Sequence, residues 1–132
     1  NLMKVNKNIG VIDAQDALYG NMAYDLASLI DDVRIKTTNK LKEKIFLEFI
    51  RSNKKVDKNK LKNDFEILSV LRNLKIIGIF TRLSIRDKKH NYLKLIPHAW
   101  KLIEYRVNKN HKFKELRSVL DKYFPKKIRK LK

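Results

Sequence analysis

The segment from Leu61 to about Arg86 constrains the fold most, because apolar residues recur in it at helical spacing. Seven of them stand three residues apart and four more widen the apolar face: Phe65, Leu68, Leu71, Leu74, Ile77, Phe80 and Leu83, with Ile67, Val70, Ile76 and Ile79. A helix that is apolar over so much of its circumference is typical of the centre of a helical bundle. The β-branched residues leave a strand open for 76–80, but the flanks favour helix. Gly78 either weakens this helix or permits a close packing contact.

Shorter patterns on both sides predict further helices. The first carries an apolar face formed by Ala23, Leu26, Ala27, Ile30 and Val33. A second, over 39–51, has a stripe of Leu41, Ile45, Glu48 and Phe49, and a polar loop over 52–60 then offers Asp57 as a helix cap. Pro97 suits the first turn of a helix that runs to about Arg106, and a last helix spans about 113–123. The fold class is therefore mainly α.

The N-terminal residues predict a short β-hairpin that delivers an acid. Apolar segments 2–5 and 9–12 are joined by Asn6-Lys7-Asn8, a three-residue loop, and the second segment ends at Asp13. With Lys7 at the midpoint, Asn1 and Asp13 lie opposite each other, with Cα atoms about 4.5–5.5 Å apart. An amide oxygen and a carboxylate placed so could bind one Mg²⁺ ion. The simpler alternatives are a turn-capping acid for Asp13 and a frayed chain end for Asn1.

Composition limits the classes of function. The 132 residues suit one domain, without cysteine, signal peptide or an apolar run of membrane-spanning length, so we expect a cytoplasmic protein with no membrane partner. The net charge of +18 would attract polyanions, but 24 of the 32 basic residues are lysine and only 8 are arginine. Lysine excess of this kind favours solvated faces and genomic composition bias over a surface that reads nucleic acid. We therefore expect no specific nucleic-acid partner.

Other polar groups have simpler interpretations. The adjacent Asp31 and Asp32 diverge by about 100° on a helix, which favours solvated side chains over a metal pair. The three histidines, His90, His98 and His111, lack the spacing of metal ligands. Arg72, Lys75, Arg82 and Arg86 share a helix face, which is a solvated stripe or, alternatively, a wall that faces an anionic substrate.

Three stretches of the chain, in the same order, resemble a known family. Residues 11–29 (VIDAQDALYGNMAYDLASL), 72–83 (RNLKIIGIFTRL) and 92–97 (YLKLIP) look like the C-terminal lobe of aminoglycoside phosphotransferase-like small-molecule kinases. The subgroup most similar phosphorylates N-acetylmuramate or N-acetylglucosamine at the anomeric hydroxyl in cell-wall recycling. The resemblance extends to about Pro125, so we expect a partial kinase-like domain over 1–125 and a basic tail over 126–132. A hairpin followed by about five helices is what this lobe implies.

The resemblance also implies roles for single residues. Asp13 matches the aspartate that binds magnesium, as the Asp of Asp-Phe-Gly does in protein kinases, and Asn1 matches the asparagine that holds a second magnesium. Gln15 and Asp16 belong to the same active-site turn. Asp25 matches a helix aspartate that braces the catalytic loop. ATP and Mg²⁺ are the implied cofactors, and a small hydroxylated acceptor, an amino sugar in the closest subgroup, is the implied partner; the oligomeric state is not indicated.

The chain departs from the family in two ways. Ala14 stands where the family usually has an aromatic residue, and the chain opens with Asn1, after the point where the nucleotide-covering loop, the phosphate-binding lysine and the catalytic aspartate of the His-x-Asp motif stand in such kinases. We therefore expect part of a larger enzyme that is inactive alone, with no catalytic base among these residues. The alternatives are a basic helical nucleic-acid-binding protein and a non-catalytic kinase-like scaffold.

Overall fold

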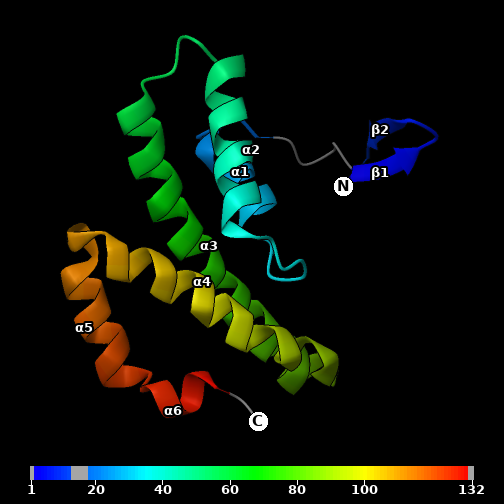
Figure 1. Cartoon of the computed structure of the whole chain (residues 1–132). Coiled ribbons are helices and arrows are strands. Elements are labelled where there is room, and N and C mark those ends of the chain that lie inside the picture. The colour runs from blue at the N-terminus through cyan, green and yellow to red at the C-terminus, as the bar shows by residue number, and fades with distance from the viewer. Residues whose placement is uncertain (1, 13–17, 131–132) are drawn as a thin grey trace.

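The computed structural model describes residues 2–12 and 18–130, and these are mainly helical (Figure 1). The described residues form a two-stranded hairpin followed by six α-helices and two short 3-10 helices, which confirms the predicted fold class. The elements are β1 (Leu2–Val5), β2 (Asn8–Val11), α1 (Ala23–Ile30), α2 (Asn39–Ser52), α3 (Lys58–Asp87), η1 (His90–Leu95), α4 (Ile96–Lys109), η2 (His111–Phe113), α5 (Lys114–Tyr123) and α6 (Lys126–Arg129).

The hairpin has a tighter turn than the sequence predicts. Antiparallel pairing matches Leu2 with Val11 and Val5 with Asn8, so the turn contains only Asn6 and Lys7. Asn6 has a φ of 55°, a left-handed conformation that asparagine tolerates better than most residues do. The predicted three-residue loop is therefore wrong by one residue of register. Because the centre of the turn lies between Asn6 and Lys7, Asn1 and Asp13 are not the same number of residues from it; both lie outside the described residues.

The apolar side chains of the hairpin are exposed. Ile9 and Val11, on alternate positions of β2, are 71% and 74% exposed, and Met3 and Val5 of β1 are about half exposed. In Figure 1 the hairpin lies to one side of the helices. It contributes no residue to the two buried apolar clusters that the described residues form.

Helix α1 begins where a side chain satisfies its first donor. The Asn21 Oδ1 atom accepts a hydrogen bond from the Ala23 N–H at 3.0 Å, as side chains before a helix commonly do. The predicted apolar face is buried as far as Ile30, where the helix ends. Val33 lies beyond the helix and is buried in the apolar cluster that contains Val70 and Trp100.

The packing face of helix α2 matches the predicted one only at Ile45 and Phe49. Thr38 caps the helix by accepting a hydrogen bond from the Leu41 N–H. The apolar cluster formed by α1 with Leu61 and Phe65 is covered by four side chains of α2: Ile45, Phe46, Phe49 and Ile50. Leu41 and Glu48, which the sequence places on the stripe, are exposed. The face is rotated because Phe46 and Ile50 take part in it, and this brings Lys42 to its inner edge.

Helix α3 is the long central helix that the apolar spacing predicts. The Asp57 Oδ1 atom caps it by accepting from the N–H groups of Asn59 (2.8 Å) and Lys60 (2.9 Å), as predicted. Its first half joins α1 and α2 around Leu61 and Phe65, and its second half packs on α4 around Val70 and Phe80. At Gly78 an added Cβ would meet nothing within 4 Å, so this glycine permits no close contact.

The C-terminal helices fold back on α4, whose first turn holds Pro97 as predicted. Trp100 and Ile103 of α4 are buried, and α5 adds Leu120 to the same cluster. The sequence predicts a basic tail from Lys126 onward, but Lys126–Arg129 forms the short helix α6. Arg129 is 5% exposed and its guanidinium lies over the Trp100 ring at 4.9 Å.

Candidate functional site

The predicted metal ligands cannot be placed. Asn1, Asp13, Gln15 and Asp16 all lie outside the described residues, so their proximity stays a prediction. The described elements that flank them are β2, which ends at Val11, and α1, which begins at Ala23. Within residues 2–12 and 18–130 no group of three or more His, Asp or Glu side chains could hold a metal ion.

Asp25, the predicted brace, stands in the first turn of α1 and is exposed. A carboxylate at this position interacts favourably with the positive end of the helix dipole. Its role as a brace stays a prediction, because the catalytic loop that Asp25 would contact is not among the described residues.

A buried ionic cluster links four elements at the end of α1. The Asp31 carboxylate is 1% exposed and accepts hydrogen bonds from Lys42 Nζ at 2.6 Å, Ser69 Oγ at 2.6 Å and Arg106 Nη2 at 2.8 Å. The Arg106 guanidinium also lies over the Phe65 ring at 4.7 Å. We call these four polar residues, Asp31, Lys42, Ser69 and Arg106, the Asp31 cluster.

The Asp31 cluster keeps its carboxylate ionised. Burial alone would raise the pKa of Asp31, but the Arg106 charge and the hydrogen bonds from Lys42, Ser69 and Arg106 outweigh it, so the pKa lies below the ordinary 3.8. Removing one partner of such a buried pair leaves a charge without compensation, which makes the cluster a strong constraint on how α1, α2, α3 and α4 pack.

The expectation that Asp31 and Asp32 are solvated is wrong. Asp31 is buried as above, and Asp32 is paired with Arg34, whose Nη2 lies 2.6 Å from Asp32 Oδ2. The hydrogen bond from Arg34, offset in part by burial, lowers the pKa of Asp32. Neither residue lies in a helix, because α1 ends at Ile30, so the helical spacing assumed for this pair does not apply.

The sequence contains only a partial signal for the Asp31 cluster. Asp31 stands four residues after Ala27, Lys42 four residues before Phe46, and Arg106 four residues after Leu102. Each charged residue therefore continues the apolar face of a helix, where an unpaired charge would be costly. The same spacing occurs at exposed charges, such as Lys54 four residues after Ile50, so the spacing alone does not predict the pairing.

A groove of about 460 Å³ opens beside this cluster between α2, α3 and α4. Cations line it from all three helices: Lys42, Lys58, Lys62, Arg106 and Lys109. Its floor is aromatic, since Phe46 and Phe65 lie with ring centroids 5.3 Å apart and Tyr105 stands beside them. We call this the cationic groove; a concave aromatic surface with a few charged groups is typical of a site for a small organic ligand.

The predicted basic stripe on α3 does not act as one wall. Arg82 and Arg86 border an apolar groove of about 560 Å³ with Trp100 and Phe124, and Arg86 is paired with Asp87 at 2.6 Å. Lys75 is exposed and Arg72 half-buried. Neither of these two lines that groove, so the stripe is divided between different surroundings.

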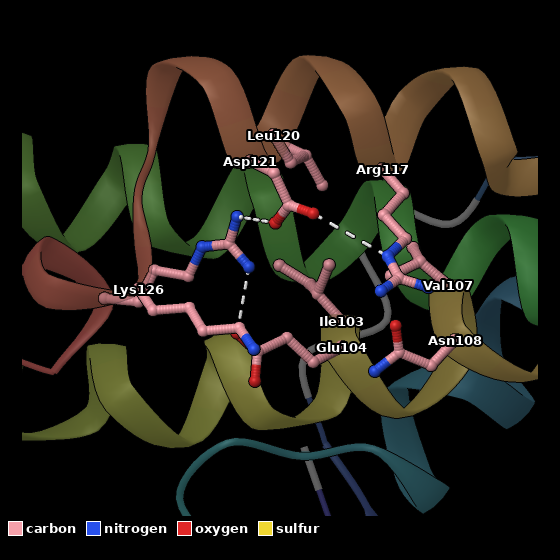
Figure 2. Close-up of a pocket in the computed structure, with 9 residues that line it drawn as sticks. Ile103, Glu104, Val107, Asn108, Arg117, Leu120, Asp121 and Lys126 are labelled. Carbon is pink, nitrogen blue, oxygen red and sulfur yellow. Dashed lines mark hydrogen bonds and ion pairs between the residues drawn. The ribbon is translucent and has the colours of Figure 1, made fainter.

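A third hollow, of about 60 Å³, lies where α4, α5 and α6 meet (Figure 2). Arg129 Nη1 contacts Glu104 Oε1 at 2.9 Å and its Nη2 contacts Asp121 Oδ1 at 2.7 Å, while Arg117 lies on the other side of Asp121 at 3.6 Å. The space suffices for about two water molecules. These contacts hold α6 to α4 and α5.

The histidines stand apart, as their spacing predicts. His90 Nδ1 is 2.8 Å from Ser84 Oγ, and His111 is exposed. His98 is half-buried, and burial, with the nearby Lys42 and Lys36 charges, lowers its pKa below 6.5. Among the helices of the described residues none combines the length and apolarity needed to cross a membrane.

Comparison with known proteins finds sequence similarity to kinases. The chain matches no established family profile. The curated proteins that it does resemble are kinases of amino sugars, which confirms the resemblance that residues 11–29 and 72–83 predict.

The relatives are N-acetylmuramate/N-acetylglucosamine kinases. The one from Caulobacter vibrioides is 29% identical over 92% of this chain and 33% of its own length. The one from Neisseria meningitidis is 35% identical over 74% of this chain and 31% of its length, and the one from Pseudomonas aeruginosa 30% identical over 91% and 37%. The chain thus spans about a third of the length of the curated relatives it matches.

Proposed function

We propose that this chain is the C-terminal part of an ATP-dependent phosphotransferase that acts on an amino sugar. The observation that carries the proposal is the likeness to kinases of N-acetylmuramate and N-acetylglucosamine over about nine tenths of the chain. The described elements agree with it, because a hairpin precedes α1 where the resemblance requires a strand that delivers the metal-binding acid.

In this proposal the metal is bound by Asn1, which precedes β1 in the sequence, and by the segment between β2 and α1. Asp13 and Asn1 would supply carboxylate and amide oxygens, which are the ligands that Mg²⁺ prefers, with Gln15 and Asp16 in the same turn. The ion would bridge and neutralise phosphate oxygens of ATP during transfer. Asp25, on the exposed first turn of α1, is free to contact a neighbouring loop as a brace.

We also propose that these 132 residues do not transfer phosphate alone. Phosphoryl transfer depends on positioning the nucleotide and the acceptor hydroxyl, and the resemblance assigns the catalytic aspartate and the phosphate-binding lysine to another part of the enzyme. The relatives are about three times as long as the region matched here, which supports this division.

Two measurements test the proposal. Incubated with radiolabelled ATP, Mg²⁺ and either amino sugar, the 132-residue chain should give no labelled product. The DNA upstream of the Asn1 codon should encode an in-frame His-x-Asp motif, and the protein from that longer frame should phosphorylate the sugar. In it Asp13→Ala should lower kcat by about a thousandfold or more, whereas Glu48→Gln, on exposed α2 surface, should not. Turnover by the short chain would contradict its inactivity, and an upstream frame without the motif would favour a non-catalytic scaffold.

A further inference from the structure

We propose that the cationic groove between α2, α3 and α4 binds the carboxylate of an acidic sugar. The proposal rests on the proposed function, since it concerns which of the two sugars in the relatives' names this chain would bind more tightly. N-acetylmuramate carries a carboxylate and N-acetylglucosamine does not. A groove that holds this group would favour the acidic acceptor.

The first support is an excess of positive charge in nearly buried surroundings. The side chains of Lys42 and Arg106 are only 12% and 13% exposed, yet both pair with the single carboxylate of Asp31. One positive charge is thus left without a full counter-charge where water screens it poorly. Both side chains line the groove, so an anion in it would complete the compensation.

The second support is the charge of the rim. Lys58, Lys62 and Lys109 add three cations, whereas the groove's own acids are Glu43 and Glu66. The Oε2 atom of Glu66 accepts a hydrogen bond from Asn110 Nδ2 at 2.6 Å, and because that amide is neutral, Glu66 still counts among the acids of the groove. Even with Asp31 counted, the five cations exceed the three acids by two.

The third support is the shape and the floor. A volume of about 460 Å³ is ample for one monosaccharide, and the rings of Phe46, Phe65 and Tyr105 offer apolar surface beside the cations. Sites for small organic ligands combine such surfaces with a few charged groups that fix orientation. Lys109 Nζ is held against Tyr105, 2.9 Å from its hydroxyl and 4.2 Å from the ring centroid, so one rim cation is already positioned.

The test is the binding of each sugar to the 132-residue chain, detected by nuclear magnetic resonance of its aromatic rings. The titration is made in about 0.15 M salt, where long-range attraction by the net charge is screened. N-acetylmuramate should shift Phe46, Phe65 and Tyr105. N-acetylglucosamine should bind about tenfold more weakly, because it lacks the charge-assisted contact. The proposal is overturned if the two sugars bind alike, if the groove rings do not shift, or if inorganic phosphate shifts them while N-acetylmuramate does not.

A matched pair of variants separates the groove from the general positive charge. Lys62 lines the groove, whereas Lys60 is exposed on the same helix about 200° away. Lys62→Glu should weaken N-acetylmuramate binding by about threefold to tenfold, and Lys62→Arg should retain it. Lys60→Glu changes the net charge equally and should have no effect. Equal loss in both Glu variants would show attraction by net charge and would overturn the proposal.

The result is separable from that of the phosphotransfer assay. Binding of N-acetylmuramate in the groove without sugar phosphorylation by the longer protein would refute the proposed function alone. Phosphorylation of both sugars with equal KM, unaffected by Lys62→Glu, would refute the groove assignment alone.

Discussion

At the scale of the residue, Asp31 determines how the helices meet. Its carboxylate receives Lys42 from α2, Ser69 from α3 and Arg106 from α4, and each contact is shorter than 3 Å. The net value of a buried ion pair is small, since desolvation offsets attraction, but the loss of one partner is expensive. The Asp31 cluster as a whole therefore adds little net stability, but the removal of Asp31 alone costs much.

Replacing Asp31 tests this asymmetry. Asp31→Asn preserves the shape but leaves Lys42 and Arg106 buried without their counter-charge, so we expect the free energy of unfolding to fall by about 3–5 kcal/mol. Glu48→Gln makes the same chemical change at a 65% exposed side chain and should alter it by less than about 0.5 kcal/mol. Urea denaturation followed by circular dichroism measures both, and equal effects would show that the Asp31 cluster is not a structural constraint.

The titration of His98 gives a prediction about pH. Burial, followed by the charges of Lys42 and Lys36, lowers the pKa of His98 below 6.5. The unfolded chain therefore takes up this proton at a higher pH than the folded chain does, and stability falls as pH decreases from 6.5 towards the folded pKa. His98→Gln should flatten the pH dependence of the free energy of unfolding in that window. A histidine titration curve by nuclear magnetic resonance with a midpoint above 6.5 would contradict the sign.

At the scale of the element, helix α3 organises the molecule. Its first half covers α1 and α2, and its second half covers α4, so both apolar clusters share it. It begins at a capped turn and ends at Asp87, and the next residue, Lys88, has a left-handed conformation with a φ of 55° before η1. The stability of this one helix is therefore coupled to both clusters.

The cap of α3 provides a test at this scale. Asp57→Ala removes the acceptor of the Asn59 and Lys60 N–H groups, and we expect a loss of about 1 kcal/mol in the free energy of unfolding. Asp57→Asn keeps an acceptor in the same place and should retain most of the stability. Thermal unfolding of the two variants measures the difference, and an Asn variant as unstable as the Ala variant would mean that the carboxylate charge, rather than the cap, is responsible.

Helices were predictable from sequence where the apolar period and the cap residues agreed, as at α3 and around Pro97. The hairpin loop was not, because Asn6 takes a left-handed conformation that shortens the turn by one residue and shifts the register. The face of α2 and the pairing of Asp31 depend on which helix packs beside which, and this is decided by tertiary contacts. The candidate metal ligands, Asn1 and Asp13, were predicted from the hairpin geometry and from the family resemblance, and both lie outside the described residues.

At the scale of the whole molecule, the net charge is +18, and some of the positive side chains are paired with acids. Arg34, Arg86, Arg106 and Arg129 are all paired with acids of the same chain, which leaves the excess largely to lysines. Lysines spread over exposed helix surfaces attract polyanions without the bidentate geometry that arginine provides for phosphate.

We therefore expect weak binding to random duplex DNA that disappears near physiological salt. In a titration by fluorescence anisotropy, affinity should fall steeply with salt and be undetectable at about 0.15 M, as expected for counterion release without base contacts. Retention of sub-micromolar affinity at that salt, or preference for one sequence, would instead support the alternative of a nucleic-acid-binding protein.

The Asp31 cluster has a consequence for the exchange of segments between relatives. Its charged members come from positions 31, 42 and 106, so a chimaera that imports α4 alone also imports whatever stands at the position of Arg106. Unless the three sites are inherited together, the hybrid carries a stranded ion in its interior. Crossovers that separate 31–42 from 106 should therefore be rarer in successful recombinants than crossovers elsewhere in the chain.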